Sequence, residues 1–194
     1  MDNDYRNDIV TKVANVFNDA GGSIGPIDIL PSHDLLFELH TDVSTLAKGQ
    51  FIDLLRPLPT GWRRIASFSG PDVAEFLAAL DKGYGVLADR KRGYFVAWRK
   101  GSAVWRIDAP ARGVDGYVPD TGWAVTKLTA VTTGAPLDPL KPSSIGGGIT
   151  GKWRYAPDMD CYIGIPAPPN SWTADTLAPV YAYKPANWAD PRTA

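Results

Sequence analysis

Histidine and acidic side chains are the first candidates for chemistry in this sequence, because they hold metal ions and transfer protons. The chain has two histidines, His33 and His40. Their separation of seven positions matches no zinc-binding spacing, and a neighbouring aspartate does not complete a ligand set. Asp158 and Asp160 could begin a calcium loop, but a strand-like run follows and supplies no further oxygen ligands. The sequence therefore predicts no metal site, and it predicts a turn at these two aspartates.

A catalytic set is not indicated by spacing either. Asp53, Asp89 and Asp108 lie far apart in the chain, so a glycoside hydrolase would need two of them to converge in the fold. No Gly-x-Ser-x-Gly motif is present, and no Ser, His and Asp set can be nominated. The glycine-rich run before Lys152 differs from a phosphate-binding loop, because Trp153 follows the lysine. We therefore expect no catalytic residue and no cofactor, and keep a glycoside hydrolase as a less favoured alternative.

Aromatic side chains are the remaining candidates for ligand binding, because their rings stack on sugars. Trp98, Trp105 and Tyr181 lie in strand-like segments, where aromatic residues more often belong to the core. Trp172 lies in a proline-rich loop, where a tryptophan either folds back on the body or faces a partner. These four residues are the predicted binding candidates, with a glycan as the ligand of a lectin-like alternative.

Charge and composition exclude several partner classes. The 20 basic and 21 acidic residues give a net charge of −1, so the sequence predicts neither nucleic-acid nor anionic-membrane binding. The single Cys161 cannot form an internal disulfide. Met1 is followed by Asp2-Asn3-Asp4 rather than by a basic and then an apolar run. We expect no signal peptide, no transmembrane span and synthesis in the cytoplasm.

The elements that would position these residues recur along the chain. The tripeptide Thr-Gly-Trp occurs at 60–62 and again at 121–123. Each of three units contains two strand-like segments around a polar turn, which predicts a β-hairpin, and a further strand before a closing tryptophan. The predicted hairpins span about 29–39, 86–98 and 154–165, the further strands begin at Phe51, Ala103 and Val180, and the units open with lead strands at Val10, Arg63 and Val125.

This repetition predicts an all-β chain of three propeller-blade-like antiparallel sheets, a partial β-propeller with one short helix. The three repeats, at about 8–61, 62–122 and 123–188, form a single domain with short terminal tails. We expect Phe37, Phe95 and Ile163 at equivalent inward positions. The helix is expected near residues 71–81, where a cap and a proline precede apolar residues at helical spacing. Residues 134–148 and 166–179 are rich in glycine or proline and are expected to be loops.

The stretch 152–165, Lys-Trp-Arg-Tyr-Ala-Pro-Asp-Met-Asp-Cys-Tyr-Ile-Gly-Ile, followed by Val180 to Pro185, resembles the blade pattern of bacterial Kelch-like β-propellers. In that pattern a tyrosine precedes a Pro/Asp turn, a strand follows, and an aromatic outer strand ends the unit. The resemblance is strongest over 146–188 and departs from Kelch because paired glycines do not end the second strand of each unit. It implies blades, and it implies a binding platform more often than an enzyme.

Three blades do not close a ring, since propellers carry about four to eight. The sequence therefore predicts a non-catalytic structural or adhesion subunit that assembles with copies of itself or with other subunits, for instance in a phage virion or on a bacterial surface. The expected interface residues are Val13, Val16 and Phe17 at one end of the stack, and Tyr181 and Tyr183 at the other.

Overall fold

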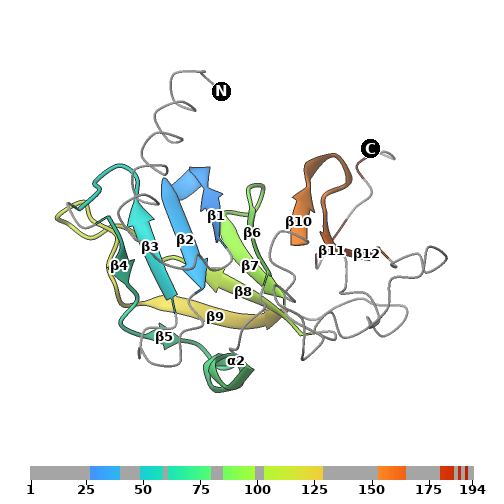
Figure 1. The fold of residues 1–194 in the computed structure, drawn as a ribbon, viewed down its shortest axis with the longest axis horizontal. Coiled ribbons are helices and arrows are strands. Elements are labelled where there is room, and N and C mark those ends of the chain that lie inside the picture. Colours follow the sequence, from blue (N-terminus) through green and yellow to red (C-terminus); the bar gives the residue numbers. More distant parts are fainter. Residues whose placement is uncertain are drawn as a thin grey trace, which may run out of the picture.

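The computed structural model describes residues 27–39, 49–58, 61–79, 85–98, 103–128, 153–164, 180–185, 188 and 191. This part of the chain is mostly β, with three sheets and one short helix (Figure 1), so the all-β prediction is confirmed. The predicted lead strand at Val10 and the predicted loops at 134–148 and 166–179 lie outside the described residues.

The first and second sheets share one antiparallel order. The first sheet runs β1 (Ile27–Leu30), β2 (Leu35–Leu39), β3 (Gly49–Asp53) and β4 (Arg63–Arg64). The second runs β6 (Gly85–Asp89), β7 (Tyr94–Trp98), β8 (Val104–Asp108) and β9 (Trp123–Leu128), and β5 (Phe68–Ser69) pairs in parallel with β9. The third sheet runs β10 (Trp153–Ala156), β11 (Cys161–Gly164) and β12 (Tyr181–Tyr183).

The three predicted hairpins are confirmed, and their turns share one backbone feature. A 3-10 turn joins the strands in the first hairpin (Pro31–His33) and in the third (Pro157–Met159). The residue that ends each of these turns, Asp34 or Asp160, has a positive φ, and Gly93 takes that place in the second hairpin with a φ of 76°. Aspartate and glycine tolerate this left-handed conformation, which explains their presence directly before the second strand.

The Gly-Trp of the repeated Thr-Gly-Trp marks the entry to β4 in the first sheet and to β9 in the second. Gly61 and Gly122 have φ values of 71° and 82°, so each glycine makes a left-handed turn before its tryptophan. The strand that follows pairs with the preceding sheet, because β4 pairs with β3 and β9 pairs with β8. The predicted lead strands at Arg63 and Val125 therefore end the preceding sheet and do not open the next one.

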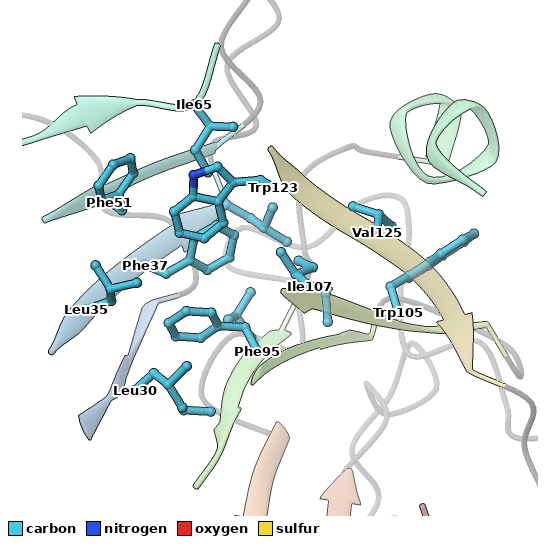
Figure 2. Close-up of a cluster of buried hydrophobic side chains, with 14 of the residues drawn as sticks. Leu30, Leu35, Phe37, Phe51, Ile65, Phe95, Trp105, Ile107, Trp123 and Val125 are labelled. Carbon is cyan, nitrogen blue, oxygen red and sulfur yellow. The ribbon is translucent and has the colours of Figure 1, made fainter. Parts of the chain in front are cut away.

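The first and second sheets pack face to face around the largest core cluster (Figure 2). Phe37 from β2 lies 4.8 Å from Phe95 of β7 between ring centroids, and 5.5 Å from Trp123 of β9. Along β8, Trp105 and Ile107 point into this core while Val104 points to the opposite face. The side chains of β8 therefore alternate between two cores, and β8 lies inside its sheet because β9 flanks it.

The third sheet packs on the other face of the second. Leu87, Val96 and Val104 of the second sheet meet Trp153 and Tyr162 of the third in a second buried cluster. Every described residue of β6 and β7 is buried, since these strands have a neighbouring sheet on each side. This double coverage explains why their sequence is apolar without a period of two.

The stacking has a constant direction. We call the face that carries the third residue of the second strand (Phe37, Val96 or Ile163) the forward face of each sheet, and the opposite face the backward face. Phe37 faces the second sheet and Val96 faces the third, whereas Phe95 faces back towards the first. Each forward face therefore packs on the backward face of the next sheet.

This arrangement corrects the predicted equivalence of Phe37, Phe95 and Ile163. Counted from the hairpin turns, Phe37, Val96 and Ile163 are equivalent, and Phe95 belongs with Leu36 and Tyr162. Phe37 and Phe95 touch because they lie on facing sides of adjacent sheets. Ile163 is half-buried, because the forward face of the third sheet has no further described sheet against it.

The predicted helix is confirmed as α2 (Val73–Ala79). Its Phe76 is fully buried, 5.6 Å from the rings of both Phe68 and Trp105. The helix thus covers the margin of the second sheet beside β5 and β9 (Figure 1).

Truncation of Phe95 tests this core. Phe95 is 0 % exposed and contacts the facing sheet, so Phe95→Ala should lower the free energy of unfolding by about 3–5 kcal/mol through lost burial and a residual cavity. Denaturant unfolding measures the change. Val114→Ala, at a fully exposed loop position, is the control and should change stability by less than about 0.5 kcal/mol. A loss below about 1 kcal/mol for Phe95→Ala would contradict this core assignment.

Candidate functional site

Among the described residues, a group of ionisable side chains lies where the second and third sheets meet, beside their hairpin turns. We call Asp89, Arg92, Tyr155, Asp160 and Tyr162 the turn cluster. Arg92, in the second hairpin turn, forms two hydrogen bonds of 2.8 Å to the Asp160 carboxylate and one of 2.9 Å to Asp89. A single guanidinium therefore joins the turn of the third hairpin to the end of β6.

Asp160 is nearly surrounded by donors. Its side chain is 4 % exposed and also accepts from Lys91 Nζ at 2.7 Å and from the Tyr155 hydroxyl at 2.9 Å. The hydrogen bonds from Arg92 outweigh burial and hold the pKa of Asp160 well below its usual range. The pKa of Arg92 is raised, since its hydrogen bonds to Asp160 and Asp89 outweigh its own burial. Both groups are charged at neutral pH and neutralise each other.

Asp89 terminates β6 and accepts from several donors. Its carboxylate receives the backbone N–H groups of Lys91 and Arg92, at 3.1 and 2.9 Å, and so fixes its own turn. It also accepts a 2.5 Å hydrogen bond from the buried Tyr162 hydroxyl of the third sheet. Burial and this hydrogen bond to a carboxylate raise the pKa of Tyr162, so the phenol stays protonated.

A second clamp holds the loops beside the first sheet. Arg112 makes a two-pronged contact with the buried Asp53 at the end of β3, with hydrogen bonds of 2.6 and 2.9 Å, and donates to the His33 carbonyl at 3.1 Å. Burial opposes ionisation of Asp53, but Arg112 and backbone N–H donors outweigh it and lower the pKa. This clamp ties the loop after β8 to the first sheet.

The three carboxylates singled out from the sequence do not converge into a catalytic pair. Asp53 pairs with Arg112, Asp89 with Arg92, and Asp108 with Arg106 at 2.6 Å. Each acid thus has its own guanidinium and accepts its hydrogen bonds. A glycoside hydrolase needs two carboxyl groups that flank one bound sugar, whereas each of these three is held in a separate ion pair. The arrangement is suited to holding sheets together.

The predicted binding aromatics fall into different environments. Trp98 and Trp105 are buried, in the clusters between the second and third sheets and between the first and second sheets. This agrees with the core interpretation and leaves their rings unavailable for stacking on a glycan. Tyr181 is half-buried at the start of β12. Trp172 lies outside the described residues.

Tyr183, predicted as an interface residue, points to the side of β12 that is packed against the second sheet. Its ring is 8 % exposed and stacks on Tyr162 at 5.7 Å, facing the second sheet, and burial raises the pKa of its hydroxyl to about 12. Because strand side chains alternate, the residues that point outward are its neighbours Ala182 and Lys184. The predicted residues Val13, Val16 and Phe17 lie outside the described part of the chain.

The outward-facing side of the third sheet is the candidate functional surface. We call its forward face, formed by Arg154, Ile163, Val180 and Ala182, the outer face. Arg154, Ile163 and Ala182 form one row across the three strands, and Val180 is 63 % exposed. The sequence pattern identified the strand at 180–183 but not which of its two sides faces outward. That side follows from the pairing of Tyr183 with the buried Tyr162.

The described residues contain no group of three or more His, Cys, Asp or Glu side chains arranged to hold a metal ion. Across the same residues, no helix has the length and apolar character required to cross a membrane.

Comparison of the chain with protein-family models, with curated proteins and with solved structures found no match. The Kelch-like resemblance therefore stays a prediction.

Neutralising Asp160 tests the turn cluster. Asp160→Asn should lower the free energy of unfolding at pH 7 by about 3 kcal/mol, because it leaves Arg92 with one carboxylate fewer in a buried site. The folded-state pKa of Asp160 is depressed, so its contribution is present above the unfolded pKa of about 3.9 and is lost as the pH falls below that value. The variant should therefore lose less stability than the wild type on acidification.

Unfolding curves recorded from pH 7 to acid measure both effects. Asp120→Asn, at an exposed position, is the control and should stay within about 0.5 kcal/mol of the wild type. If Asp160→Asn behaves like this control, the cluster does not hold the two sheets together.

Proposed function

We propose that this protein is a non-catalytic structural subunit that works in contact with other protein chains, and that the outer face of the third sheet is its contact surface. One observation carries the proposal. The positions equivalent to Ile163 in the first two sheets, Phe37 and Val96, are fully buried against a following sheet, whereas Ile163 is half-buried beside exposed Val180 and Ala182. A sheet face of this kind is completed when another sheet covers it.

The direction of the stack supports the same conclusion. The first strands of adjacent sheets lie beside one another, β1 against β6 and β6 against β10, and every forward face meets a backward face. Consecutive propeller blades stack in this way, and we propose that the chain itself supplies three blade-like sheets. Under this proposal, another chain covers the forward face of the third sheet.

The use made of the buried charges favours a structural role over a catalytic one. Asp53, Asp89 and Asp160 are each paired with an arginine, and the pairs of Asp53 and Asp160 join different elements of the fold. Charges neutralised in this way contribute to fixed geometry and are poorly placed to exchange protons with a substrate.

Oxidative footprinting tests the proposal on the assembly as it exists in the organism that makes the protein. Val180, 63 % exposed on the outer face, should be labelled readily by hydroxyl radicals in the purified chain and more slowly in the native complex, where a partner covers it. The exposed first-sheet loop residue Leu55 provides a reference in the same digest. Equal labelling of Val180 in both samples would contradict the proposed contact surface.

A further inference from the structure

We propose that the occupant of the outer face is a second copy of this chain, related by a two-fold axis, with the outer faces of the two third sheets in contact. The inference rests on the proposed function and specifies the partner. It starts from the row Arg154, Ile163 and Ala182, in which a half-buried apolar residue is flanked by an exposed cation and an exposed small residue, with Val180 beside it.

Head-to-tail addition of a copy is disfavoured by the other end of the stack. Such an addition would place the backward face of one copy's first sheet on the outer face of the next. That backward face carries Leu36, Ile52 and Leu54, and the first two are 2 % exposed within a single chain. Since these side chains are already covered, the backward face of a second copy is not free to pack on the outer face. The outer face of the second copy is therefore the surface that meets it. A two-fold contact of this kind uses one patch twice and closes at a dimer.

Charge complementarity supports the two-fold arrangement. Arg154 lies on the outer face, and Asp158 lies in the turn that follows the same strand. Both side chains are exposed, and neither forms a hydrogen bond or ion pair among the described residues. A two-fold axis can bring Arg154 of each copy to Asp158 of the other, which forms two equivalent ion pairs around the apolar residues. Lys184, the other cation on this side, lies 3.9 Å from the Trp188 ring centroid of its own chain.

The test is a charge swap read by sedimentation equilibrium of the purified full chain over a wide concentration range. The wild type should be a dimer whose dissociation constant rises with salt. Arg154→Asp alone places acid against acid and should weaken the dimer by about tenfold or more, and Asp158→Arg alone should do the same with two cations. The double variant Arg154→Asp/Asp158→Arg restores opposite charges and should recover most of the wild-type affinity.

Two controls separate this effect from misfolding or from general charge. Arg64→Asp, on β4 of the first sheet, alters an exposed arginine away from the third sheet (Figure 1) and should leave the dimer unchanged. The near-ultraviolet circular dichroism of each variant should match the wild type. Val180→Lys adds a readout independent of the ion pairs and should also dissociate the dimer.

A monomeric wild type would overturn the second-copy proposal, and so would a dimer that is indifferent to the single reversals or is not recovered by the double variant. Protection of Val180 in the native assembly, combined with a monomeric purified chain, would assign the outer face to a different subunit. That result would retain the proposed function and refute only the two-fold contact.

Discussion

Burial of both faces of the second sheet is the interaction on which the rest of the structure depends. Phe95 and Trp105 on one face close the core with the first sheet, while Val96 and Trp98 on the other close the core with the third. A single antiparallel sheet cannot bury enough apolar surface to offset the entropy lost on ordering its strands. The first and third sheets are therefore each stabilised through contact with the second, and the stacking order follows from that dependence.

Ion pairs and hydrogen bonds fix the relative position of adjacent sheets, which apolar contacts alone leave adjustable. Packing of Trp153 and Tyr162 against Val96 and Leu87 tolerates small sliding of one sheet along the next, because burial is not directional. Hydrogen bonds from Arg92 to Asp160 and from Tyr162 to Asp89 need defined distances and angles. The turn cluster thus specifies one register between the sheets, and Asp53 with Arg112 does the same for the loops beside the first. The stabilisation comes at the expense of chemical availability, since paired charges are not free to react.

Local patterns in the sequence were sufficient for the hairpins, the helix at 73–79 and the turn at Asp160, because each depends on neighbours in the chain. Patterns could not show which sheet the strand after Trp62 or Trp123 joins, since that choice depends on pairing partners. They also placed Tyr183 on the wrong side of β12, because all of its residues are compatible with either side until Tyr162 is seen opposite Tyr183. The partnership of Arg92 with Asp160 spans 68 positions and has no local signal.

The repeat adapts one structural position to three surroundings. Counted from the hairpin turns, Asp28, Leu87 and Arg154 are equivalent, and all three point to the forward face of their sheets. Asp28 accepts the Ala88 backbone N–H of the second sheet at 2.8 Å, and Leu87 is buried between sheets. Where a sheet follows, the residue thus either caps a backbone donor of that sheet or packs as an apolar side chain. At the third position, where no described sheet follows, the arginine is exposed, and a guanidinium retains its charge both in water and beside the carboxylate that we propose as its partner.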